Sequence, residues 1–191
     1  MQYFSYNIST EIIELAEIYF PTDYTSQIQK KHTYEQSLGG RYLVSKIVEE
    51  NWGVLGFLPR VDEGGKPVSE GGFFWSISHS QDHVYVGVSG NPIGVDIEVI
   101  RTRDESLFGT FSEQEWNILG EKNWESFYIL WSAKEALVKR HLGGVDDVVN
   151  WQLVKVEGIS EGMKRLFFTD GGSREAVYSE AGNEIVMSIC G

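Results

Sequence analysis

The chain of 191 residues is acidic, with 28 Asp and Glu residues against 16 Lys and Arg residues and a formal net charge of −12. An acidic chain has no global positive field to attract phosphates, which argues against general binding to nucleic acids or anionic membranes. Hydrophobic residues make up 41% and aromatic residues 13% of the chain, as is typical of a globular protein. The length allows one domain or two small lobes with a buried core.

Cys190 is the only cysteine, so an intramolecular disulfide is excluded and a reducing cytoplasm is the simplest location. The first residues do not combine a basic region with a long apolar region. No run of about 18 apolar residues occurs anywhere in the chain. We therefore expect a soluble, untargeted, cytoplasmic protein.

The first half of the chain is expected to begin with helices. Apolar residues at helical spacing predict a helix over residues 10–20, begun by Ser9 or Thr10 and ended by Pro21. A second helix is predicted over residues 33–52, although the pair Gly39–Gly40 weakens it locally. Strands are expected after the turn-rich residues 61–72, and they cover residues 73–80, 83–90 and 92–100.

The second half repeats this order of helices followed by strands. Ser112 and Glu115 form the pattern of a capping box at the start of a helix. A longer helix is predicted over residues 124–141, ended by Gly143 and Gly144. The short strands that follow are expected at residues 151–158, 164–169, 175–180 and 184–190. The shared order is compatible with two related lobes, but it does not establish a repeat.

The segment GVDIE places two carboxylates, Asp96 and Glu98, on one face of a predicted strand. We expect Val95 and Ile97 on the other face to anchor the strand in the core. A pair of acidic residues at this spacing is usually a solvated strand face. Two carboxylates are also the partial ligand set that Mg²⁺ accepts while it keeps waters and phosphate oxygens.

The segment WSAKEALVK places Glu135 and Lys139 one helical turn apart. One interpretation is an ion pair on the surface of an amphipathic helix, which is common. The other is a third metal carboxylate beside a lysine that neutralises phosphate charge. In FSEQE, Glu113 and Glu115 suit the positive end of a helix, and near a metal either one could accept a proton from a hydroxyl group.

Three polar residues precede these segments in the chain. Ser78 and His79 do not form a serine hydrolase motif, because no G-x-S-x-G sequence is present. A histidine that donates to a ligand phosphate remains open. Lys66 lies in a glycine-rich turn that lacks the spacing of a Walker A loop, so it either approaches an anion or serves solubility.

The order of these segments, namely GKP, ISHS, GVDIE, FSEQE and WSAKEALVK, resembles that of the 4'-phosphopantetheinyl transferases. The length resembles the larger monomeric type that activates peptide and polyketide synthetases. The resemblance implies an α+β fold of two similar lobes related by a pseudo-twofold axis, each with a small antiparallel sheet and helices. The lobes are expected at residues 1–98 and 99–191, with the active site in the cleft between them.

The resemblance also implies a reaction and its residues. Phosphopantetheine would pass from coenzyme A to a serine of an apo acyl, peptidyl or aryl carrier protein, and 3',5'-ADP would be released. By motif, Mg²⁺ would be bound by Asp96, Glu98 and Glu135, with Glu115 as the base and Lys139 beside the pyrophosphate. The coenzyme phosphates would be contacted by Lys66, Pro67, Ser78 and His79 as well as Lys139.

Two alternative functions use the same residues. A Mg²⁺-dependent phosphohydrolase acting on coenzyme A or a similar diphosphate would use water as its nucleophile. A non-catalytic module would bind coenzyme A or a carrier protein without reaction. Neither alternative, nor the transferase, requires a nucleic acid or a membrane.

Two features depart from the family pattern. Gln36 stands where the family commonly has an arginine for the coenzyme phosphates, and Arg41 is turned away from that position by roughly 140° on a helix. Lys30 and Lys31 are the alternative contacts for the 3'-phosphate. The net charge of −12 would repel an acidic carrier protein, so docking would use apolar residues. The candidates, which could equally belong to the core of a lobe, are Leu107, Phe108 and Phe111.

Overall fold

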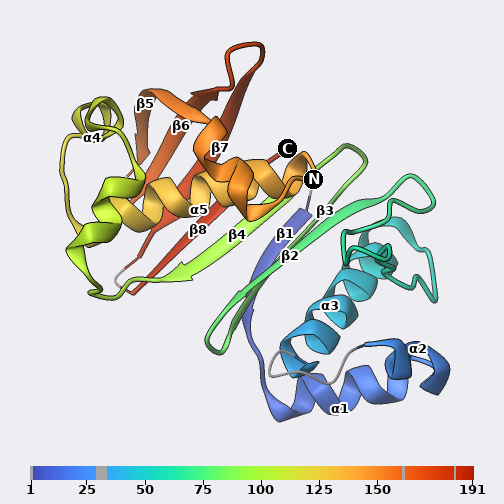
Figure 1. Cartoon of the computed structure of the whole chain (residues 1–191). Helices are drawn as coiled ribbons and strands as arrows, with labels where there is room; N and C mark the ends of the chain where they lie inside the picture. Colours follow the sequence, from blue (N-terminus) through green and yellow to red (C-terminus); the bar gives the residue numbers. More distant parts are fainter. Residues whose placement is uncertain (1, 29–33, 161, 183) are drawn as a thin grey trace. The chain divides into compact units, whose positions relative to one another are not determined.

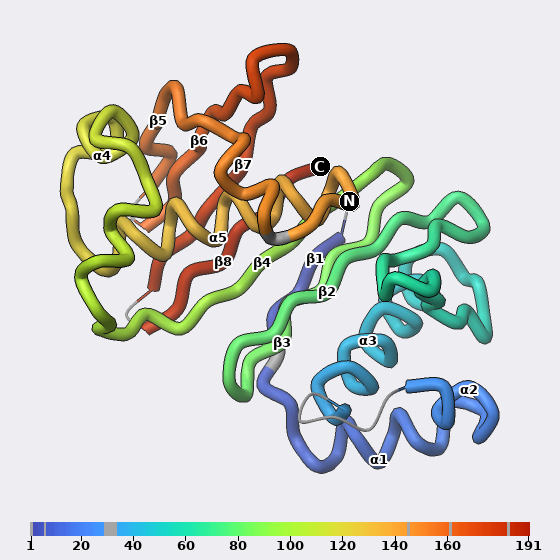
Figure 2. Tube along the Cα trace, viewed as in Figure 1, coloured from blue at the N-terminus to red at the C-terminus, as the bar shows by residue number. Residues whose placement is uncertain are grey.

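The computed structural model describes residues 2–28, 34–160, 162–182 and 184–191. The chain forms two compact units, Met1–Pro92 (unit 1) and Ile93–Gly191 (unit 2). Figure 2 traces the path of the chain through each of them. Both units combine an antiparallel sheet with helices, which confirms the predicted α+β class. The pseudo-twofold relation between the two stays a prediction.

Unit 1 is built on a three-stranded sheet in the order β1-β3-β2 (Figure 1). The sheet is covered by helix α3, whose Val44, Ile47 and Val48 pack against Val84 and Val86. Helix α1 lies against α3. The strands are β1 (Gln2–Asn7), β2 (Phe74–Ser80) and β3 (His83–Ser89), and the helices are α1 (Thr10–Tyr19), α2 (Thr22–Gln27) and α3 (Tyr34–Trp52).

Unit 2 contains a five-stranded antiparallel sheet in the order β4-β8-β7-β6-β5. Helix α5 packs against β4, β8 and β7, and Figure 1 shows it lying across the sheet. The strands are β4 (Gly94–Val99), β5 (Gln152–Ser160), β6 (Met163–Thr169), β7 (Arg174–Ala181) and β8 (Ile185–Cys190). The helical elements are η1 (Glu105–Thr110), α4 (Glu113–Leu119), α5 (Trp124–Arg140) and η2 (Val145–Asn150).

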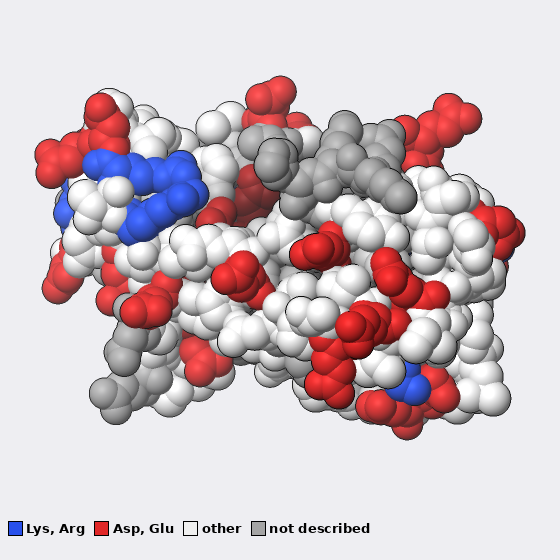
Figure 3. Space-filling model, turned by 90° about the horizontal axis from the view of Figure 1, so that it is seen from below, with Lys and Arg blue, Asp and Glu red and all other residues white. Residues whose placement is uncertain are grey.

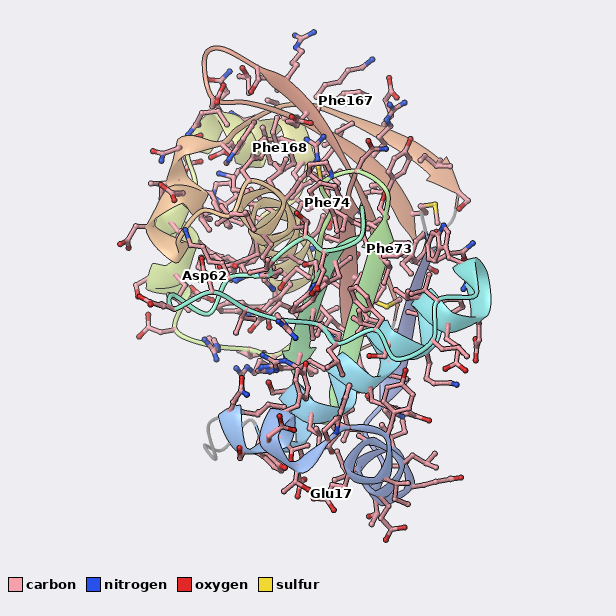
Figure 4. All side chains as sticks on the ribbon, turned by 90° about the vertical axis from the view of Figure 1, so that its right-hand side faces the viewer. Glu17, Asp62, Phe73, Phe74, Phe167 and Phe168 are labelled. Atoms are coloured by element: carbon pink, nitrogen blue, oxygen red, sulfur yellow. The ribbon has the colours of Figure 1, made fainter. Side chains whose placement is uncertain are left out.

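The core of unit 2 lies between α5 and one face of this sheet. Neighbouring residues of β6, labelled in Figure 4, show the alternation. Phe168 is fully buried with Leu166 in the core, whereas Phe167 points to the opposite face and lies beneath the guanidinium of Arg165. The alternating pattern of the sequence therefore gives this sheet one face that packs against α5.

The predicted elements are largely confirmed, including the Ser9 N-cap of α1 and the Ser112–Glu115 capping box of α4. Four elements were not predicted: strand β1, which pairs with β3, helix α2, which begins directly after Pro21, and the short helices η1 and η2. Helix α5 ends at Arg140, before the predicted glycines. Helix α3 is continuous through Gly39 and Gly40, and a methyl group on Gly40 would lie 2.8 Å from Ile77 Cγ2, so the glycines allow close packing.

The chain divides after Pro92 rather than after Glu98. The predicted boundary would have cut strand β4 away from β8, with which it pairs over its whole length from Gly94 to Val99. The segment GVDIE therefore belongs to the same unit as α4 and α5. Among the described residues, no helix has the length and apolar character needed to cross a membrane.

Gly94, the first residue of β4, lies against the backbone of α5. A Cβ atom at this position would lie 1.8 Å from the carbonyl oxygen of Ala136 and 2.5 Å from the backbone nitrogen of Arg140. Backbone atoms cannot move aside as a flexible side chain can. The absence of a side chain at Gly94 therefore sets how closely α5 approaches β4.

We expect Gly94→Ala to lower the free energy of unfolding by about 3 kcal/mol, because the added methyl group overpacks the helix–sheet contact. Gly109→Ala is the matched control in the same unit, since a Cβ atom at Gly109 would meet nothing within 4 Å. Chemical denaturation of both variants measures the difference. Equal stability of the two variants would contradict the close approach of α5 to β4.

Candidate functional site

Strand β4 places Asp96 and Glu98 on the face of the sheet that α5 covers. The two residues alternate with Val95 and Ile97 and share their face with Gly94, which contacts α5. Their cross-strand partners, Ser188 and Val186, are fully buried. The predicted common face of the two carboxylates is thus confirmed.

Val95 and Ile97 are both buried, as the prediction that they anchor β4 requires. They lie on the face opposite α5 and outside the core cluster that α5 forms with the sheet. The carboxylates, rather than the apolar residues, face the helix. The reason is that Gly94 lies against α5. Because side chains alternate between the two faces of a strand, Asp96 and Glu98 lie on the same face as Gly94, and Val95 and Ile97 lie on the other.

Lys139, near the end of α5, pairs with Asp96 across the two elements. Lys139 Nζ donates to Asp96 Oδ1 at 2.7 Å, and the side chains are 29% and 5% exposed, respectively. Glu135 lies one turn before Lys139 on the same helical face. Lys139 therefore forms an ion pair between α5 and β4. The interpretation as an ion pair within one helix does not account for this contact.

Glu135 is electrostatically coupled to both members of this pair. Burial raises the pKa of Glu135; the charge of Lys139 opposes the rise, and that of Asp96 adds to it. The net pKa lies above the ordinary value for glutamate. Glu135 of α5 is thus a partly buried carboxylate whose proton affinity depends on Asp96 of β4.

Glu115, the predicted base, is enclosed in the interior of unit 2. Its side chain is 2% exposed, and Glu115 Oε1 accepts from Lys134 Nζ at 2.7 Å and from the backbone N–H of Leu153 at 3.1 Å. Oε2 accepts from the backbone N–H and the hydroxyl group of Ser112, each at 3.0 Å. Glu115 therefore ties the start of α4 to α5 and to the start of β5.

Lys134 completes this buried pair with a side chain that is only 1% exposed. Its ammonium group lies 4.8 Å from the centre of the Phe111 ring. Burial lowers the pKa of Lys134, and Glu115 opposes that change. Burial raises the pKa of Glu115, but the bonds from Lys134, Leu153 and Ser112 outweigh it, so the net pKa is lowered.

This geometry favours a positioning role for Glu115 over that of a base, because its four accepted hydrogen bonds leave it with little affinity for a further proton. The catalytic role predicted for it stays a prediction. Glu113, in the same turn, is exposed and pairs with Lys122 at 2.7 Å. Lys134 was not among the predicted site residues, although a lysine between two apolar turns of a helix is a signal for a buried partner.

Four of the five residues predicted to contact coenzyme phosphates belong to unit 1, and the fifth, Lys139, belongs to unit 2. Lys66 is exposed, and its backbone N–H closes a turn onto Asp62 Oδ1 at 2.8 Å, with Pro67 following. Ser78 and His79 are consecutive in β2 and therefore point to opposite faces of the sheet, Ser78 being buried and His79 exposed. These two side chains do not approach one ligand from the same face.

Gln36 and Arg41, the residues of helix α3 that depart from the family pattern, have hydrogen bond partners within unit 1. Gln36 Nε2 donates to the carbonyl oxygen of Gln81 at 2.5 Å, which ties α3 to the turn between β2 and β3. Arg41 Nη1 donates to the carbonyl oxygen of Ser37 at 3.2 Å, and burial lowers the pKa of Arg41. Lys30 and Lys31 lie outside the described residues.

The apolar residues considered for carrier docking belong to the core of unit 2. Phe111 is 4% exposed within the core cluster, and Leu107 and Phe108 pack against that cluster. Phe108 lies edge-on to Trp116, with 5.5 Å between ring centres. The alternative that assigned these residues to the core is the one that the structure supports.

The three predicted metal ligands are carboxylates on facing elements of unit 2. Asp96, Glu98 and Glu135 supply hard oxygen atoms from β4 and the facing helix, as Mg²⁺ requires. Burial raises the pKa of Glu135 and the charge of Asp96 adds to the rise, and a cation would relieve the repulsion between the two carboxylates. Among residues 2–28, 34–160, 162–182 and 184–191, no three acidic, histidine or cysteine side chains already form a metal-ready group. The donor chemistry fits, with Lys139 as the present counter-ion of Asp96.

The buried pair gives a first test of this site. Lys134→Met keeps the length of the side chain but leaves the Glu115 carboxylate buried without its counter-ion, so we expect a loss of about 3 kcal/mol in the free energy of unfolding. Lys122→Met is the matched control, because it removes a 2.7 Å pair that is exposed, and it should cost under about 1 kcal/mol. Denaturant titrations of both variants decide, and similar losses would exclude a structural role for the buried pair.

The lowered pKa of Glu115 predicts the pH dependence of stability. A carboxylate with a lowered pKa in the folded state stabilises the fold above its ordinary value of 4.5, and this contribution is lost as the pH falls through the lowered pKa. Glu115→Gln should therefore be less stable than the wild type at pH 7, with a gap that narrows in acid. Unfolding measured from pH 7 to pH 3 tests this, and a gap independent of pH would contradict it.

Comparison with known proteins adds independent support. A profile of the 4'-phosphopantetheinyl transferase superfamily matches residues 92–190, which is just over half of the chain. The 4'-phosphopantetheinyl transferase gsp of Aneurinibacillus migulanus is 31% identical over 121 residues, which cover 59% of this chain and 50% of that protein. The 4'-phosphopantetheinyl transferase AcpT of Salmonella typhi is 33% identical over 133 residues, covering 63% and 62%, respectively.

A third relative, the 4'-phosphopantetheinyl transferase psf-1 of Bacillus pumilus, is 32% identical over 113 residues, covering 54% of this chain and 48% of that protein. The chain thus spans less than two thirds of the length of each of these relatives. The matched profile covers β4, α4 and α5, which hold the acidic residues, Lys134 and Lys139. On this match, the chain belongs to the 4'-phosphopantetheinyl transferase superfamily.

Proposed function

We propose that this protein transfers the 4'-phosphopantetheine group of coenzyme A to a serine hydroxyl group of an apo carrier protein in a Mg²⁺-dependent reaction. The observation that supports this most directly is the group formed by Asp96, Glu135 and Lys139 within unit 2. It joins two coupled carboxylates to an ammonium group on facing elements. The three relatives described above are all named 4'-phosphopantetheinyl transferases, which supports the same reaction.

The reaction requires that negative charge on a pyrophosphate be offset. The serine oxygen attacks the phosphorus that carries pantetheine, the bond from that phosphorus to the bridging oxygen breaks, and 3',5'-ADP leaves with the electron pair. Lys139 provides a positive charge that reaches solvent with 29% of its side chain exposed. Mg²⁺, bound by Asp96, Glu98 and Glu135, would supply further charge neutralisation to the phosphate oxygens.

The proton of the serine hydroxyl group must pass to a base. Glu115, the base that the motif implies, is enclosed by four hydrogen bond donors, and its pKa is lowered. Glu135 is proposed as a ligand of Mg²⁺, and a carboxylate beside a divalent cation accepts a proton poorly. We therefore propose that Glu115 positions α4 and α5, and its role as the base stays a prediction.

The residues that would recognise coenzyme A and the carrier protein are proposed from the sequence motifs. The contacts of Lys66, Pro67, Ser78 and His79 with the coenzyme phosphates stay predictions, as does the identity of the carrier. Figure 3 shows acidic residues spread over one face of the molecule, with lysine and arginine gathered in few places. Together with the net charge of −12, this indicates that an acidic carrier would gain no long-range attraction.

The transfer is tested by mass spectrometry of an apo carrier protein incubated with this protein, coenzyme A and Mg²⁺. We expect the carrier to gain the mass of phosphopantetheine and 3',5'-ADP to appear in equal amount. Chelation of divalent cations should stop the reaction, and added Mg²⁺ should restore it. Glu135→Gln should lower the rate by about 10-fold or more, because it removes one charged ligand of the proposed Mg²⁺ site. Lys122→Met removes only the exposed ion pair with Glu113 of α4, so this variant should retain the wild-type rate.

The other outcomes separate the alternative functions. Free phosphopantetheine in solution would identify a phosphohydrolase. Binding of coenzyme A without any product, by a protein that is folded, would identify a binding module. A wild-type rate for Glu135→Gln would remove this residue from the reaction.

A further inference from the structure

The counter-ion of Asp96 is a side chain of the protein itself. Lys139 Nζ lies 2.7 Å from Asp96 Oδ1, and the side chain of Asp96 is only 5% exposed. A carboxylate this deeply buried is costly unless a positive charge lies beside it. The ammonium group of Lys139 supplies this charge at an oxygen atom that the proposed function assigns to the divalent cation.

We propose that Lys139 and the divalent cation compete for Asp96, and that coenzyme A removes this competition by drawing Lys139 to its phosphates. Lys139 is then a positioning residue that couples the binding of the cation to that of the coenzyme. The proposal rests on the proposed function and extends it to the order in which the site is assembled.

Competition follows from the charges and distances. Lys139 Nζ lies 2.7 Å from Asp96 Oδ1, so a divalent cation bound to the same carboxylate would lie close to a second positive charge, and the two would repel each other. A second carboxylate, Glu135, adjoins this pair, and the charges of both Lys139 and Asp96 act on it. The site therefore attracts a divalent cation, but the cation must displace the lysine.

Lys139 is also able to leave. It lies in the last turn of α5, is 29% exposed, and carries its charge on a flexible four-carbon stem. Neighbouring cations of the helix are committed elsewhere: Lys134 to the buried Glu115, and Arg140 to Glu175 at 2.6 Å. Release of Lys139 removes a positive charge from beside the buried Asp96, so it becomes more favourable when a cation takes its place.

The test measures Mn²⁺ binding to the full-length chain by electron paramagnetic resonance, without a carrier protein. Wild type, Lys139→Met, Lys122→Met and Asp96→Asn are compared with and without coenzyme A. Lys122→Met is the matched control, because it removes the same charge from a pair of the same length elsewhere in unit 2. Thermal unfolding of each variant verifies that it is folded.

Without coenzyme A, we expect Lys139→Met to bind Mn²⁺ about fivefold or more tightly than the wild type, and Lys122→Met to bind as the wild type does. Coenzyme A should tighten Mn²⁺ binding to the wild type by a larger factor than it tightens binding to Lys139→Met, in which no lysine has to leave Asp96. The comparison of the wild type with and without coenzyme A involves no substitution, so it stands even if a variant fails to fold. Asp96→Asn should lose the site.

Three results would overturn the inference. Equal or weaker Mn²⁺ binding by Lys139→Met would show that the lysine does not compete. Wild-type affinity that is unchanged by coenzyme A would show that the two ligands are not coupled. Equal binding by Asp96→Asn and the wild type would place the cation elsewhere. The transfer assay is independent of these measurements, so phosphopantetheinylation by the wild type alongside any of them would leave the proposed function in place.

Discussion

The close approach of α5 to β4 at Gly94 is the constraint on which the candidate site depends. The backbone of Ala136 lies where a side chain of residue 94 would otherwise be. Because Glu135 precedes Ala136, and Asp96 follows Gly94 by two residues on the same face, this contact brings the helix and strand carboxylates into electrostatic range of each other. The ion pair between Lys139 and Asp96 then spans the same crossing.

The ion pairs of the two lysines of α5 have different physical consequences. Lys134 and Glu115 are almost fully buried, and the carboxylate is saturated with hydrogen bonds, so this pair fixes the helix relative to α4 and β5. Lys139 is partly exposed and pairs with the buried carboxylate of Asp96. Its charge also acts on the nearby carboxylate of Glu135. A buried, saturated pair resists change, whereas a pair at the edge of solvent can exchange its partner. Structural and chemical roles are thereby divided between two lysines of one helix.

Much of the fold was accessible from local patterns. Capping at Ser9 and Ser112, the period of the long helices and the alternation in GVDIE were all predicted, because each depends on residues within a few positions of one another. Strand β1 was missed because it is defined by its pairing with β3, more than 70 residues away in the chain. The boundary at Pro92 was missed for the same reason, since β4 belongs with β8 at the end of the chain.

The sequence by itself determined that Asp96 and Glu98 share a face, that Glu135 and Lys139 share another, and that the order of the motifs resembles one family of transferases. Those conclusions follow from the fixed geometry of strands and helices. Only the tertiary structure decided that the carboxylates of β4 face α5, that Lys139 pairs with Asp96 and that Glu115 is enclosed with Lys134. Which face of a strand is covered, and which charge is buried, depends on elements that pack together from distant parts of the chain, and no local pattern contains that information.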